Sequence, residues 1–136
     1  MSFRHTYELL VLEAHLDSFG HMNNATYLQV LEEARWDLIT TRGYSYNRIH
    51  ETGIGPTILE ISLEFKREIK LRERISIITW IEDYSRVVGT IRQEMRRPEG
   101  DLRCQATFKV ALFDIKRRKL IPPTKEWKHA VGVDET

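Results

Sequence analysis

The sequence predicts an α+β domain in which one long helix faces an antiparallel sheet. Two patterns carry this prediction. Apolar residues recur with the period of a helix over residues 24–41, and they alternate with the period of a strand in four later segments. The strands follow one another through short connections, so neighbouring strands are expected to be antiparallel. A helix and a sheet that each carry an apolar face are buried against one another.

The first strand is expected within residues 3–13, and a polar stretch over residues 15–24 separates it from the long helix. Asn23 or Asn24 can cap the start of this helix, and Gly43 can supply the left-handed residue after its end. The stripe expected to face the sheet consists of Tyr27, Leu28, Leu31, Ala34, Arg35, Leu38 and Ile39. Arg35 is the one polar member of the stripe.

A second, short helical turn is expected around residues 45–51, and the Gly-Ile-Gly-Pro run at 53–56 is expected to be a turn. From Thr57 onward the period is two, which indicates strands. The first of these strands is expected to leave one face in water, because Glu60 and Glu64 alternate with its apolar residues. The alternating segments cover residues 57–65, 75–81, 87–95 and 102–112, with turns expected at 83–86 and 97–101.

The length of 136 residues fits one domain over residues 1–136. The 21 basic and 20 acidic residues nearly cancel, which argues against a disordered chain and against a strongly basic nucleic-acid-binding protein. The balance is uneven along the chain, however. Residues 1–65 contain 4 basic and 9 acidic side chains, whereas residues 66–136 contain 17 basic and 11 acidic ones.

Cys104 is the single cysteine, so no disulfide within the chain can form, and a reducing compartment is expected. No signal peptide is evident at the N-terminus, and no apolar run approaches the ~20 residues that span a bilayer. The sequence therefore predicts a cytoplasmic protein. It also lacks the common metal, phosphate-loop and serine-nucleophile motifs, so no metal and no separate cofactor are expected.

The polar stretch before the long helix is the place where the residues suggest chemistry. Asp17 lies close in sequence to a helix N-terminus, which presents unpaired N–H groups and a partial positive charge. Such an end can stabilise an oxygen that becomes negative during acyl transfer. However, aspartate and asparagine before a helix more often serve as caps or turn formers. Residue types alone therefore leave the function open.

The order of residues is more specific. The run Asp17-x-x-x-His21-x-Asn23-Asn24-x-x-Tyr27-Leu28, followed by Leu31-Glu32-Glu33-Ala34-Arg35-Trp36-Asp37, resembles the active-site loop and central helix of hotdog-fold acyl-CoA thioesterases. These form the 4-hydroxybenzoyl-CoA thioesterase-like superfamily, and the run is most similar to its bacterial long-chain acyl-CoA thioesterase branch. The resemblance implies five or six antiparallel strands wrapped around the helix, and a homodimer, paired edge to edge, that assembles to a homotetramer.

The resemblance also implies roles for individual residues. Asp17 would be the catalytic carboxylate, either as a general base for water or as a nucleophile. The oxyanion donor would be the backbone N–H of Asn24 or of its neighbour, while His21 and Asn23 would orient the loop or the water. Tyr27 would line the acyl pocket, although a place in the core is equally compatible with its position.

The implied substrate is an acyl-CoA, with medium to long acyl chains and a role in lipid metabolism; coenzyme A is part of the substrate and not a cofactor. Its phosphates require cations. Arg86 is one candidate, and the others are Lys66, Arg67, Lys70, Arg72, Arg74, Arg96, Arg97 and residues 116–119. Two alternatives stay open: a thioesterase for acyl carrier proteins, and a non-catalytic acyl-CoA-binding protein of the same fold.

Overall fold

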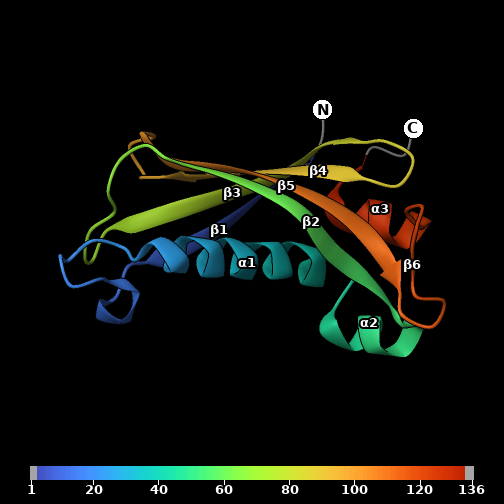
Figure 1. The fold of residues 1–136 in the computed structure, drawn as a ribbon. Coiled ribbons are helices and arrows are strands. Elements are labelled where there is room, and N and C mark those ends of the chain that lie inside the picture. Colours follow the sequence, from blue (N-terminus) through green and yellow to red (C-terminus); the bar gives the residue numbers. More distant parts are fainter. Residues whose placement is uncertain (1–2, 134–136) are drawn as a thin grey trace.

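The computed structural model describes residues 3–133, which form one six-stranded sheet with a long helix on its inner face (Figure 1). In chain order the elements are β1 (Arg4–Leu10), the short 3₁₀ turn η1 (Glu13–His15), α1 (Asn24–Thr41), α2 (Tyr46–Thr52), β2 (Ile54–Phe65), β3 (Arg74–Tyr84), β4 (Gly89–Arg96), β5 (Leu102–Asp114), β6 (Lys119–Ile121) and α3 (Lys125–Val131).

All strand pairs are antiparallel, and the main order is β1-β3-β4-β5-β2, with β6 paired to β5. Strands β3, β4 and β5 follow one another as hairpins in the middle of the sheet. Strands β1 and β2 lie at opposite edges, so the chain must cross the sheet between them, and α1 makes that crossing (Figure 1). The hotdog arrangement predicted from the sequence, a sheet curled around one long helix, is confirmed.

The predicted long helix is confirmed at residues 24–41. The side chain of Asn23 caps it by accepting a hydrogen bond from the N–H of Ala25 at 2.9 Å. Its buried face consists of Thr26, Tyr27, Val30, Leu31, Ala34, Leu38 and Ile39. Leu28, which the sequence places on this face, is 37% exposed, and Val30 is buried instead. Leu28 is turned by about 100° from Tyr27, which moves it to the edge of the stripe.

The strand expected from Thr57 begins earlier, at Ile54, and includes Pro56. Proline is tolerated there because β2 is an edge strand, paired to β5 on one side, and needs no donor toward the open edge. Apolar residues alternate along β2 as expected, but several of their side chains are exposed. Leu59, Ile61 and Phe65 are 47%, 46% and 54% exposed. The described chain therefore leaves an apolar sheet edge uncovered.

The C-terminal elements β6 and α3 are not predicted by the sequence patterns. Thr124 caps α3 by accepting the N–H of Trp127, and Gly132 ends it with a positive φ of 89°. Trp127 is fully buried and donates its indole N–H to the hydroxyl of Tyr84 at 3.1 Å. The position of α3 depends on this tertiary contact with β3, which the local sequence does not reveal.

Cys104 lies on the core face of β5 with no exposed surface, and burial raises the pKa of its thiol to about 12. The thiolate is the reactive form, so at pH 8 almost none is present in the folded protein. We expect iodoacetamide to leave Cys104 unmodified under native conditions and to modify it fully in denaturant. Intact-mass measurement distinguishes these results, and rapid native labelling would contradict the burial.

Candidate active site

The loop that contains Asp17 is closed by hydrogen bonds to that residue. One carboxylate oxygen, Oδ1, accepts the N–H of Phe19 at 2.9 Å and of His21 at 3.2 Å. The N–H of Asp17 donates to the carbonyl of His21 at 2.8 Å, and Gly20 permits the tight turn with a φ of 83°. Oδ2 accepts no hydrogen bond among residues 3–133. Asp17 therefore shapes the loop with one oxygen and keeps the other available.

The start of α1 uses nearly all of its backbone donors internally. Asn23 N–H donates to His15, Ala25 N–H to the Asn23 side chain and Thr26 N–H to the Asn23 carbonyl. Across residues 3–133 no acceptor is found for the N–H of Asn24, the first residue of the helix. A helix N-terminus leaves such orphan donors for water or for a ligand. Of the two positions expected for an oxyanion donor, Asn24 is therefore the one still free.

His21 and Asn23 contribute differently. The side chain of Asn23 is used as the helix cap, so in this structure it is not free to orient a water molecule. The imidazole Nε2 of His21 lies 3.6 Å from Glu68 Oε2, and its backbone bridges to Lys70. The N–H of Met22 also donates to the carbonyl of Ile69 at 2.8 Å. The loop is thus held against the segment that follows β2.

Tyr27 is in the core of the described protomer. It is 4% exposed, and its ring meets Phe65 edge to face with centroids 4.9 Å apart. Burial is the main cause that raises the pKa of its hydroxyl, and the negative charge of Asp17 adds a smaller contribution. The contact of Tyr27 with an acyl chain stays a prediction.

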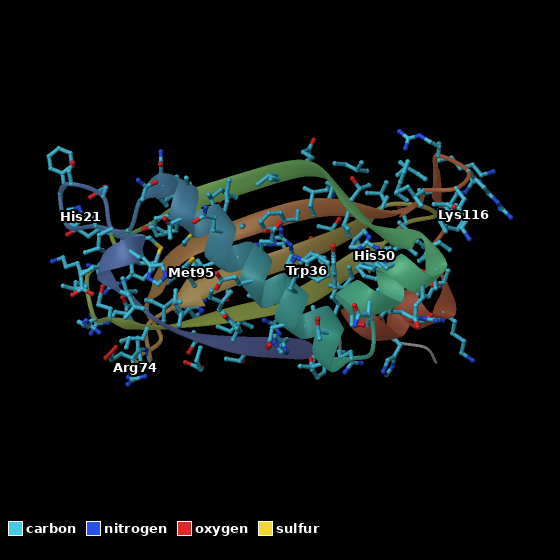
Figure 2. All side chains as sticks on the ribbon, turned by 90° about the horizontal axis from the view of Figure 1, so that it is seen from below. His21, Trp36, His50, Arg74, Met95 and Lys116 are labelled. Atoms are coloured by element: carbon cyan, nitrogen blue, oxygen red, sulfur yellow. The ribbon has the colours of Figure 1, made fainter. Side chains whose placement is uncertain are left out.

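Arg86 is not brought to the Asp17 loop of the same protomer. It lies in the turn between β3 and β4, beyond Tyr84, whereas Arg74 at the other end of β3 is on the same side of the molecule as His21 (Figure 2). A strand of 11 residues separates the two ends by about 34 Å. Arg86 therefore lies at the end of β3 that is remote from Arg74, and its contact with a substrate stays a prediction.

A polar groove lies beside the loop, lined by Lys66, Arg67, Glu68, Lys70, Glu73, Arg97 and Arg103. Most of its cations already have carboxylate partners: Lys66 with Glu64 at 3.2 Å, Lys70 with Glu68 at 3.5 Å, and Arg97 and Arg103 both with Glu73, at 3.4 and 3.1 Å. Arg67 alone among these cations has no carboxylate within 4.0 Å in the described part of the chain. The groove is therefore less cationic than its sequence suggests.

An apolar hollow of about 100 Å³ lies between the C-terminal half of α1 and strands β2, β4 and β5. Its wall includes Trp36, Ile58 and Trp127, together with the side chain of Arg35. Arg35 stacks on Phe108 at 4.0 Å and donates to Gln93 Oε1 at 3.0 Å, and burial lowers its pKa to about 10. This hollow is not predicted by the sequence. The one indication of it in the sequence is Arg35, the single charged residue in the apolar stripe of the long helix.

Across residues 3–133, no three histidine, cysteine, aspartate or glutamate side chains form a group suited to a metal ion. None of the described helices is long and apolar enough to cross a membrane.

A family model described as the thioesterase-like superfamily matches residues 11–131. The chain belongs to this superfamily. The matched range begins before the Asp17 loop and ends with α3, so it includes the sheet strands β2 to β6, the central helix and the loop.

Individual members of the thioesterase-like superfamily agree with this assignment. The long-chain acyl-CoA thioesterase FadM of Escherichia coli (strain K12) is 29% identical over 109 residues, 79% of this chain and 81% of FadM. The putative acyl-CoA thioesterase YneP of Bacillus subtilis (strain 168) is 29% identical over 100 residues, 74% of this chain and 72% of YneP. The structure of the probable thioesterase YbaW from Escherichia coli has a TM-score of 0.82 at 25% identity and covers 93% of this chain and 95% of YbaW.

Proposed function

We propose that this protein hydrolyses acyl-CoA thioesters to a free acid and coenzyme A, with Asp17 as its catalytic carboxylate. One observation carries the proposal. Oδ1 of Asp17 is fixed by two backbone N–H groups, while Oδ2 and the N–H of Asn24 are both free in the described protomer. A carboxylate and an oxyanion donor on one short segment are what attack on a carbonyl carbon requires. The names of FadM and YneP support the same substrate class.

The reaction can follow two routes from this geometry. As a general base, Oδ2 takes a proton from water while the water oxygen adds to the thioester carbonyl. The Asn24 N–H then stabilises the oxyanion, the C–S bond breaks, and the thiolate receives the proton from Asp17. As a nucleophile, Oδ2 adds to the carbonyl itself and expels the thiolate, and water then hydrolyses the acyl anhydride. Both routes require that Oδ2 of Asp17 has no competing hydrogen-bond partner. In both, the leaving group is a thiolate, which departs without protonation by a strong acid.

We expect the protein to work as a homodimer paired along β2. This strand presents unpaired backbone groups along its open edge and the exposed apolar side chains of Leu59, Ile61 and Phe65. Such an edge is a template for pairing with another strand, and an identical copy supplies one with matching side chains. The further assembly of dimers into a tetramer stays a prediction.

The hollow beside Arg35 supports acyl groups longer than acetyl. Its wall is mostly apolar and includes Ile58 on β2, the edge at which we place the second copy. The hollow is far from the loop of its own chain, because Arg35 lies eleven residues along α1 from Asn24, about 17 Å along the helix axis. Antiparallel pairing along β2 would bring it toward the loop of the other copy, where an acyl chain could enter it.

A substrate panel tests this function. Purified protein is given acyl-CoA thioesters with short, medium, long and aromatic acyl groups, and thiol release is recorded for each. We expect the highest kcat/KM with medium or long chains. The same acyl groups on an acyl carrier protein distinguish the main alternative, which would show a higher kcat/KM on the carrier protein. Tight binding of acyl-CoA without turnover would instead indicate a non-catalytic binding protein.

A further inference from the structure

Arg35 is the only basic residue of α1, and its side chain is held in a fixed position. The guanidinium stacks on Phe108 at 4.0 Å and donates to Gln93 Oε1 at 3.0 Å. Gln93 is fully buried, and its amide nitrogen donates in turn to the carbonyl of Leu31 at 3.0 Å and to the hydroxyl of Thr79 at 2.9 Å. A buried polar network whose members are satisfied rigidifies its surroundings. Arg35 is therefore a cation at a defined place between the helix and the sheet.

The charge of Arg35 has no counterion in contact with it. Among residues 3–133 no carboxylate oxygen lies within 4.0 Å of its guanidinium. Burial lowers the pKa of Arg35 to about 10, and the negative charge of Glu32 opposes this shift only in part. The hydrogen bond to Gln93 uses one of the five N–H donors that a guanidinium carries. A desolvated cation with free donors is stabilised when an anion reaches it.

Arg35 presents this charge to the apolar hollow of about 100 Å³, since it forms part of the hollow's wall. The rest of the wall is apolar apart from Glu32, which is exposed to solvent, so that water screens its charge. A water-sized group occupies ~30 Å³, and the hollow therefore accommodates about three such groups. This is the size of a carboxylate, and so the hollow fits the end of an acyl group.

The hollow lies where the acyl group of a neighbouring active site can reach it. Trp36 of its wall is between His21 and Lys116 along the length of the molecule (Figure 2). Two other wall residues, Pro56 and Ile58, belong to the first half of β2. Antiparallel pairing along β2 places this half beside the last half of the other β2, toward the end at which the other Asp17 loop is held.

We propose that Arg35 forms the far end of the acyl site and selects acyl groups that end in a carboxylate, so that the preferred substrates are CoA thioesters of dicarboxylic acids. A carboxylate offers two acceptors to the planar guanidinium fork, whereas a methyl end leaves the charge of Arg35 uncompensated. This inference rests on the proposed function and on the dimer along β2. It assigns a role in recognition to a buried cation that the hydrolysis itself does not use.

The first test compares substrates of equal chain length on the wild-type protein. The acyl groups end in a methyl, a hydroxyl or a carboxylate, and each series covers several chain lengths. We expect the carboxylate substrate to exceed the methyl substrate about tenfold in kcat/KM, with the hydroxyl substrate between them. Because Arg35 is fixed, this preference should peak at one chain length. A methyl substrate that is equal or better at every length, or a hydroxyl substrate better than the carboxylate, would overturn the proposal.

The second test removes the charge. Arg35→Met keeps a long, unbranched side chain, and we expect kcat/KM to fall about tenfold for the carboxylate substrate and to stay nearly unchanged for the methyl substrate. The matched control is Arg4→Met, which also removes a guanidinium stacked on an aromatic ring, that of Trp80 at 3.9 Å, but from β1 at the opposite edge of the sheet. It should leave both substrates unchanged. Equal losses of Arg35→Met on both substrates would show a purely structural role and would refute the inference.

Arg35→Lys keeps the charge and loses the planar fork, and it tests the proposal even if Arg35→Met does not fold. We expect it to retain only part of the preference for the carboxylate substrate, because an ammonium group cannot bind a carboxylate through two parallel hydrogen bonds. An unchanged ratio of the two kcat/KM values in Arg35→Lys would contradict selection by the guanidinium.

Direct binding separates this inference from the proposed function. Thioether analogues, in which an alkyl chain on the sulfur of coenzyme A ends in a methyl or a carboxylate, cannot be hydrolysed. By calorimetry we expect the carboxylate analogue to bind wild type about tenfold more tightly than the methyl analogue, and the two to bind Arg35→Met equally. Equal binding to wild type would refute the role of Arg35 even if hydrolysis is confirmed. A retained difference in a protein that hydrolyses no thioester would support the site and refute only the hydrolase.

Discussion

Replacing Asp17 with asparagine is expected to lower kcat for acyl-CoA hydrolysis by about 10³-fold, the scale of a lost general base or nucleophile. The amide oxygen can still accept the N–H groups of Phe19 and His21, so the loop should keep its shape. We therefore expect the free energy of unfolding to change by less than ~1 kcal/mol. Thiol release and denaturant unfolding on the same samples measure the two quantities.

Two further variants interpret that result. Asp17→Ala removes both hydrogen bonds as well as the carboxylate, so it should lose activity and also destabilise the loop. Asp17→Glu keeps the charge but moves it by one methylene, and it should retain only a small part of kcat because the reacting oxygen is misplaced. Wild-type turnover by Asp17→Asn would refute the assignment of Asp17 and, with it, the proposed mechanism.

The second large effect is expected from Asn24→Pro. Proline at the first position of a helix lacks the N–H but costs the helix little, because that donor has no partner within the helix. The preceding residue must be extended, and Asn23 already has φ −63° and ψ 139°. Loss of one oxyanion donor typically costs 10²–10³ in kcat, and we expect about that loss with little change in thermal unfolding temperature.

Asn24→Ala is the matched control, since it removes the side chain and keeps the backbone N–H. We expect it to retain most of the wild-type kcat. If both variants lose activity equally, the side chain of Asn24 and not its N–H is important. If Asn24→Pro is folded and fully active, the oxyanion must be stabilised elsewhere.

The sequence was most informative where a long periodic segment met a specific motif. The helix, predicted roughly over residues 24–41 with Asn23 or Asn24 as its cap, is confirmed, because eighteen residues carry enough periodicity to be recognised. The Asp17 loop was located from its residue pattern. Elements β6 and α3 were not predicted, because their stability comes from tertiary partners such as Tyr84 and Asp114.

Side-chain roles within the motif required the structure. Asn23 and Asn24 are adjacent and chemically identical. The side chain of Asn23 caps the helix, whereas the backbone N–H of Asn24 has no acceptor in the described part of the chain. The sequence could not decide between them, because the choice depends on where the helix starts. Cations near Asp17 looked like phosphate ligands, but ion pairs to Glu64, Glu68 and Glu73 occupy most of them.

By itself, the sequence determined the α+β class, the central helix and the position of the Asp17 loop, because these depend on local periodicity and on a contiguous motif. Only the tertiary structure decided which groups are free and which are distant. It showed that β2 is an uncovered edge, that Arg86 follows the end of β3 that lies about 34 Å from Arg74, and that Lys116 and His21 lie at opposite ends of the molecule. These are facts of strand order and register, which arise from contacts between residues far apart in the chain.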